Sequence, residues 1–267
     1  MANVYGWSKD PRTRLEPNGS MVDLIALDKK FPDLASALKM TIGSGDIDLS
    51  PYCVAMDQYQ LSSCTGNATC ESLEILENLT TGSATILSRL FTYAMARTIE
   101  GTLNADVGSH VRTCFDTLSR FGVCTEDIWP YDMSQVNVSP SILSQQQAVG
   151  HKLTGYYRIT TDGDQRLADI QTALYNNHPV VIGTDVGDDF ENLPSGSLGP
   201  LGPPALGTIR GGHALVVVGF IGGNYLIKNS WGTGWGKDGF CLFTPDYLTW
   251  IDTSDLWVPT VAPVFTP

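Results

Sequence analysis

Apolar positions first follow a helical spacing along the chain. From Cys64 onward, Leu73, Leu76 and Leu79 recur on one face, which predicts a helix that begins at Cys64. Three further amphipathic runs are predicted: one with Ile86, Leu90, Tyr93 and Ala94, one from about Ser109 to Phe121 that stops at Gly122, and one with Leu167, Ile170 and Leu174. The first part of the chain is therefore expected to be mainly helical.

Beyond Pro179 the pattern becomes typical of strands. Apolar, β-branched runs bounded by glycine occupy 179–186, 213–220, 225–229 and 239–244. A loop rich in glycine and proline, at about 187–207, separates the first two. Helices followed by antiparallel strands predict an α+β fold with two lobes, and active sites often lie between such lobes.

Residues 1–44 show little periodicity and are interpreted as an arm laid over the rest of the chain. The predicted organisation is an N-terminal extension over 1–44, a mainly helical lobe over 45–145 and a mainly β lobe over 146–267. The arm carries Tyr5, Trp7 and an apolar run over 22–27 as possible anchors. Such an arm either blocks a cleft or straps the outer surface, and the sequence leaves both open.

The composition narrows the choice of partners. A hydrophobic content of 42% with 16% charged residues excludes disorder as the main state. The formal charge is 16 − 28 = −12, which argues against nucleic acid or an anionic membrane as the main partner. No apolar run reaches the roughly 20 residues of a membrane span, and the start lacks a secretory signal. An intracellular or virion-associated protein is therefore expected rather than a secreted one.

None of the six cysteines has the C-x-x-C spacing of a zinc knuckle or a thioredoxin-like motif. Without a secretory signal, reduced and mostly buried thiols are expected. The sequence therefore predicts neither a metal site nor a cofactor. The six are Cys53, Cys64, Cys70, Cys114, Cys124 and Cys241.

The segment Asp57-Gln-Tyr-Gln-Leu-Ser-Ser-Cys64 delivers a cysteine to the first turn of a helix. Unpaired N–H groups and the helix dipole at that position stabilise a thiolate, the form that attacks carbonyl carbon. Taken alone, however, a buried structural cysteine explains this segment better.

Two later segments carry an imidazole and an amide. His213 follows Gly211 and Gly212, which allow a ligand backbone to approach closely, and it opens an apolar strand. His110, His151 and His178 lack such a setting and are interpreted as structural. Asn229 ends a strand before a glycine-rich turn with Trp231 and Trp235. Its amide oxygen can orient an imidazole, and a tryptophan can shield that hydrogen bond from water. An aromatic turn that closes a β-barrel is the alternative.

In this order, the three segments together resemble the papain-like (C1) cysteine peptidases, and the resemblance covers nearly the whole chain. The separations are 213 − 64 = 149 and 229 − 64 = 165 residues, against about 130–150 in the family. The 187–207 loop can supply the excess. The resemblance implies a papain-like two-lobed fold whose cleft holds Cys64 as nucleophile, His213 as acid and base, and Asn229 as the orienting residue.

The resemblance also implies roles for residues around that triad. Gln58 matches the oxyanion-hole glutamine and Trp231 the shielding tryptophan. Gly108 and Gly212 lie where substrate backbone is expected to bind. Likeness to bacterial and viral branches rests on residues 106–109, Phe121-Gly-Val, Trp129-Pro-Tyr-Asp and Tyr5-Gly-Trp-Ser-Lys-Asp. The chain departs from animal and plant members at Leu61 and Thr65, where those have a disulfide cysteine and a tryptophan.

The implied activity is that of a cysteine endopeptidase, which hydrolyses polypeptides through a thioester. An arm over 1–44 that blocks the cleft would inhibit it. One alternative is an acyl-transferase or transglutaminase-like enzyme with the same nucleophile, against which an asparagine rather than an aspartate at 229 counts. Another is a non-catalytic binding homologue. The presence of all four polar residues of the implied site counts against that reading.

Overall fold

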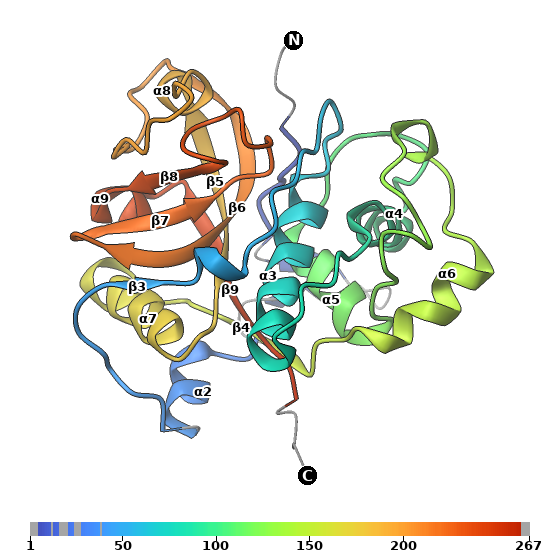
Figure 1. Ribbon diagram of the computed structural model, residues 1–267, viewed down its shortest axis with the longest axis horizontal. Coiled ribbons are helices and arrows are strands. Elements are labelled where there is room, and N and C mark those ends of the chain that lie inside the picture. Colours follow the sequence, from blue (N-terminus) through green and yellow to red (C-terminus); the bar gives the residue numbers. More distant parts are fainter. Residues whose placement is uncertain (1–4, 12, 16–20, 24–27, 38, 263–267) are drawn as a thin grey trace.

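The computed structural model describes residues 5–11, 13–15, 21–23, 28–37 and 39–262. Within these ranges one side of the molecule is mainly helical, and the other holds an antiparallel sheet with further helices packed against it (Figure 1). This arrangement agrees with the predicted α+β fold. None of the helices in the described ranges is both long and apolar enough to cross a bilayer.

The helical side is built around α3, which begins at Cys64 as predicted. Its side chains are buried on all faces as far as Leu76, because α4 and α5 cover one side and the sheet the other. The predicted second helix begins later than its apolar run: Ile86 lies outside it, and the side chain of Ser88 caps α4 by accepting a bond from the Phe91 N–H. The helices on this side are α3 (Cys64–Thr81), α4 (Arg89–Glu100), α5 (Val111–Arg120) and α6 (Ile142–Gln147).

The sheet has the strand order β4-β9-β5-β6-β7-β8, and β3 pairs with β6. Its strands are β3 (Ile47–Asp48), β4 (Gly155–Arg158), β5 (Val180–Gly187), β6 (Ile209–Ile221), β7 (Asn224–Lys228), β8 (Phe240–Phe243) and β9 (Thr253–Thr260). The four predicted strands correspond to β5, β6, β7 and β8. The helices of this side are α7 (Gly163–Tyr175), α8 (Asp188–Glu191) and α9 (Pro245–Thr249).

The N-terminal extension follows two different courses. Residues 28–37, which include α2 (Phe31–Ala37), pack against α7 and β4, and Phe31 is completely buried. This part is a structural strap on the outer side of the sheet. Before it, β1 (Thr13–Leu15) pairs with β2 (Met21–Asp23). Of the predicted apolar anchor over 22–27, residues 24–27 lie outside the described ranges. Residues 5–11 run instead between the two halves of the molecule (Figure 1).

A buried charge network holds the N-terminal extension at Asp10 and Asp28. Arg112 and Arg158 each lie 5.0 Å from the ring of Trp257, and both bind the carboxylates of Asp10 and Asp28. Those two carboxylates are only 2% and 3% exposed. Removing one partner from such a network leaves a buried charge, which typically costs about 3–5 kcal/mol. The network therefore ties the extension firmly to the body.

Candidate active site

Cys64 lies at the start of α3, where the helix packs against β6. Backbone N–H groups of Ala214, Gly6 and Thr65 interact with its sulfur. Because Ala214 directly follows His213 on β6, the sulfur lies beside the strand that carries the imidazole, although 149 positions separate Cys64 from His213 in the sequence.

The imidazole of His213 is held by Asn229. Nε2 lies 2.8 Å from Asn229 Oδ1, which also accepts a 2.8 Å bond from the Ser230 N–H. Since this oxygen can only accept, Nε2 carries the proton. Nδ1 has no hydrogen-bond partner in the described part of the chain. Trp231 covers the imidazole, with ring centroids 4.9 Å apart. The predicted His–Asn pair and its shielding tryptophan are therefore assembled, with Nδ1 left as the basic nitrogen.

Gln58 is completely buried and tied to the turn that carries Asn229. Its Oε1 accepts a 2.5 Å bond from the Ser230 hydroxyl, and its backbone N–H donates to the Ser230 carbonyl. Its Nε2 donates to the Leu61 carbonyl at 2.8 Å. Tyr131 braces the same loop by donating to the Gln58 carbonyl at 3.1 Å. Ser230 and Tyr131 were not predicted, because their roles depend on contacts between segments distant in sequence.

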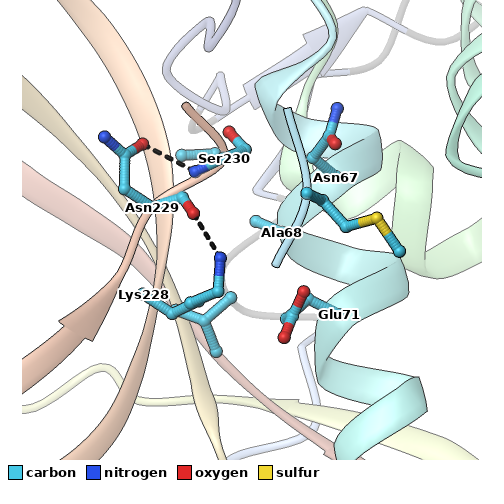
Figure 2. A pocket seen from close by; sticks show the side chains of 9 residues that line it. Asn67, Ala68, Glu71, Lys228, Asn229 and Ser230 are labelled. Atoms are coloured by element: carbon cyan, nitrogen blue, oxygen red, sulfur yellow. Dashed lines mark hydrogen bonds between the residues drawn. The ribbon is translucent and has the colours of Figure 1, made fainter. Parts of the chain in front are cut away.

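A small pocket lies behind Asn229, between the helical side and the sheet side of the molecule (Figure 2). Lys228 is buried there, and its ammonium donates to the Asn229 carbonyl at 2.6 Å. Glu71 faces it from α3; burial raises the pKa of this carboxyl, and the charge of Lys228 opposes the rise. Lys228, at the end of β7, and Glu71, on the helix that begins at Cys64, thus face each other across the pocket.

The chain's own N-terminal segment occupies the cleft. The Trp7 N–H donates to the Gly212 carbonyl at 3.2 Å, and the Ser109 N–H donates to the Gly6 carbonyl at 2.9 Å. Trp7 and Ser109 form a parallel bridge. A Cβ on Gly108, whose φ is +83°, would lie 2.1 Å from the Gly6 carbonyl oxygen. Gly108 and Gly212, both predicted to bind substrate backbone, thus line the segment that spans the cleft.

Tyr5 and Gly6 lie over the side chains of His213 and Cys64. The Tyr5 ring stands edge-on to His213 at 6.3 Å and to Trp231 at 6.2 Å between centroids. Gly6 lies so close to the backbone of Ser62 that a Cβ would be 1.8 Å from its carbonyl oxygen. Only glycine fits at this position, next to Cys64.

Complete burial sets the charge state of the site. It raises the pKa of the Cys64 thiol to about 11, despite the surrounding N–H groups, and lowers the pKa of His213 to about 4. Both groups are therefore neutral at neutral pH. The acidic thiol predicted from the helix start is wrong for this covered state, because a local dipole does not offset complete removal of the thiol from water.

The three other histidines make structural contacts. His151 pairs with Glu77 at 2.8 Å, His178 contacts the Pro259 carbonyl at 3.0 Å, and His110 contacts the Ser8 carbonyl at 2.9 Å. All six cysteines lie in described residues and are free, five of them buried. Their burial agrees with the prediction of mostly buried thiols.

Residues 53–249 match the model of the papain family cysteine proteases. A peptidase C1-like protein of Acanthamoeba polyphaga mimivirus is 32% identical over 88% of this chain and 81% of its own length. The crystal structure of xylellain, a cysteine protease from Xylella fastidiosa, is 26% identical and superposes with a TM-score of 0.79 over 97% of both chains. A Carica candamarcensis cysteine protease, 23% identical with a TM-score of 0.63 over 82% of this chain and 99% of its own, supports the fold alone. The chain therefore belongs to the papain family of cysteine proteases, with likeness to viral and bacterial members.

Proposed function

We propose that this cysteine peptidase is a latent endopeptidase with Cys64 as nucleophile, and that residues 5–11 close its cleft. The observation that carries the proposal is the course of these residues. Their backbone is bonded to Ser109 on one side of the cleft and to Gly212 on the other, with Gly6 at the thiol. A cleft that holds extended backbone across the nucleophile fits the interior of a polypeptide.

In the open cleft, His213 Nδ1 takes the proton of the Cys64 thiol, and the sulfur attacks the scissile carbonyl carbon. The N–H of Cys64 and the amide of Gln58 stabilise the oxyanion. The C–N bond then breaks, and His213 protonates the departing amine, which leaves a thioester. His213 next deprotonates a water that attacks this thioester and releases the carboxylic acid. Asn229 keeps the proton on Nε2 throughout.

The closed segment resists cleavage because it presents the wrong group to the sulfur. Gly6 offers its backbone N–H to Cys64, whereas its carbonyl is bonded to the Ser109 N–H. An N–H donor is not an electrophile. The segment therefore occupies the cleft without becoming a substrate.

Gln58→Ala is expected to lower kcat by about 10²–10³, the usual loss for one oxyanion-hole donor. Steady-state hydrolysis of a fluorogenic peptide checks this in a Gly6→Ala background, which opens the cleft. The exposed neighbour Gln60 provides the matched control Gln60→Ala. A change confined to KM would assign Gln58 to ground-state binding instead.

The pH profile of Cys64 alkylation is expected to differ between closed and open protein. With its pKa raised to about 11, the covered thiol ionises only in strongly alkaline solution, so iodoacetamide should label the wild type slowly at neutral pH. Labelling of Gly6→Ala should already be rapid at neutral pH. Mass spectrometry reads both rates, with Cys53 as internal reference. Equal rates at neutral pH would contradict closure by residues 5–11.

A further inference from the structure

The Tyr131 hydroxyl lies between two residues of the loop that leads to the nucleophile. It donates to the Gln58 carbonyl at 3.1 Å, and the Ser63 hydroxyl lies 2.5 Å from it. Since the single proton of Tyr131 goes to Gln58, the Ser63 hydroxyl is the donor in the second bond. Gln58 carries one proposed oxyanion donor, and Ser63 directly precedes Cys64, which carries the other. One hydroxyl therefore bridges the two sides of the proposed oxyanion hole.

The Ser63 end of this bridge is fixed by Asn67, which lies one turn further along α3. The side-chain amide of Asn67 donates to both the carbonyl and the hydroxyl oxygen of Ser63, at 3.0 Å each. The Ser63 carbonyl and the Cys64 N–H belong to one planar peptide group, so holding the oxygen also fixes the direction of the N–H. Ser63 is completely buried and Asn67 is 2% exposed, so water does not compete for these bonds.

The Gln58 end is tied to both sides of the molecule. On the sheet side, the backbone N–H and the side-chain oxygen of Gln58 bond to Ser230, which follows β7. Within the loop, the Gln58 carbonyl accepts from the Leu61 N–H at 3.2 Å. The bond from Tyr131 to the same carbonyl connects Gln58 to the residue before the nucleophile.

Tyr131 is itself held in place. Its backbone N–H donates to Glu126 at 2.7 Å, and the guanidinium of Arg89 lies 5.2 Å from its ring. Its side chain packs against a small buried cluster that includes Leu61 and Leu90. Burial raises the pKa of the Tyr131 hydroxyl to about 12, so the hydroxyl keeps its proton, and its role as a donor, at neutral pH.

We propose that Tyr131 is a positioning residue that sets the spacing between the two oxyanion donors, the Gln58 amide and the Cys64 N–H. This inference rests on the proposed oxyanion role of Gln58. The oxyanion exists only after the sulfur has attacked, so the spacing of its donors acts on the transition state and not on substrate binding. Loss of the bridging hydroxyl should therefore lower kcat by about tenfold, the effect of one hydrogen bond, and leave KM unchanged.

Tyr131→Phe in the Gly6→Ala protein provides the test, since it removes only the hydroxyl oxygen. Hydrolysis of a fluorogenic peptide gives kcat and KM. A peptide aldehyde gives a second measurement, because the sulfur adds to its carbonyl carbon and the carbonyl oxygen becomes the oxyanion. Affinity for the aldehyde should fall about tenfold, as kcat does. Alkylation of Cys64 by iodoacetamide displaces iodide and forms no oxyanion, so its rate should stay unchanged.

Tyr59→Phe is the matched control, because Tyr59 is exposed and lies in the same loop, with its ring centroid 6.4 Å from that of Tyr131. It should leave kcat, aldehyde affinity and alkylation rate unchanged. Ser63→Ala breaks the bridge at its other end and should also lower kcat and aldehyde affinity. Because both changes act on one bridge, the double variant should be no worse than Tyr131→Phe alone.

Unchanged kcat and aldehyde affinity in Tyr131→Phe overturn this inference alone. An equal loss in the alkylation rate also overturns it, because the hydroxyl would then support the whole site and not the oxyanion. If Tyr131→Phe does not fold, Ser63→Ala decides by the same three measurements. Gln58→Ala with full kcat and aldehyde affinity would remove the oxyanion role on which the inference rests. Absence of all cleavage by the Gly6→Ala parent, while its Cys64 is rapidly alkylated, overturns the proposed peptidase function instead.

Discussion

Cys64→Ala is expected to reduce kcat/KM for peptide hydrolysis by a factor of about 10⁶, which is typical for the loss of a catalytic nucleophile. Alanine has no group that can form the thioester, while the buried start of α3 keeps its packing. Hydrolysis of a fluorogenic peptide in the Gly6→Ala background measures the loss. Cys53→Ala, which removes the partly exposed thiol outside the site, should retain activity.

His213→Ala should cause a loss of similar size, and the double variant should be no worse than either single one, because thiol and imidazole act as a unit. Circular dichroism serves as the control for folding. Substantial turnover by a folded Cys64→Ala protein would refute the assignment of the nucleophile.

Gly6→Ala is expected to raise kcat/KM of the full-length protein by about 10³. The new Cβ would stand 1.8 Å from the carbonyl oxygen of Ser62 and 2.3 Å from its carbonyl carbon, and these backbone atoms cannot turn aside as a flexible side chain would. The estimate assumes a tethered segment at an effective concentration of about 1 mM with an intrinsic affinity of about 1 μM. Initial rates on a short peptide substrate measure the increase.

Ser8→Ala is the matched control, because this exposed residue bonds in the cleft through its backbone and should leave the rate unchanged. A lower rate or a loss of folding in Gly6→Ala would mean that residues 5–11 belong to the core. Deletion of all residues over 1–44 would not separate the two cases, since it also removes the buried Phe31 of α2.

The chemistry-bearing residues were predictable because each is marked by its own local pattern. Cys64 starts a helical periodicity, His213 follows paired glycines at a strand, and Asn229 ends a strand before an aromatic turn. Trp7 and Asp255 were not predicted as partners, since 248 positions separate them and neither has a distinctive local setting. The edge pairing of β4 with β9 was missed for the same reason: the partners lie about a hundred positions apart, as between Gly155 and Thr260.

The position of the N-terminal extension could be predicted only in part. Its sequence left open a cleft-blocking segment and an outer strap, and in the structure different parts of the extension take the two positions. Tyr5 and Trp7 stand in the cleft, whereas Phe31 packs beneath the sheet side. The position of a segment with weak periodicity depends on the surfaces against which it packs. The residues of the extension alone therefore could not show whether it lies in the cleft or on the outer surface.

The neutral, covered state of Cys64 has a consequence for damage by oxidants. Peroxides attack the thiolate, and further oxidation of the resulting sulfenic acid becomes irreversible. With its thiol pKa raised to about 11, the closed protein exposes almost no reactive sulfur. If residues 5–11 close the cleft as proposed, hydrogen peroxide should oxidise Cys64 in opened molecules and spare it in closed ones.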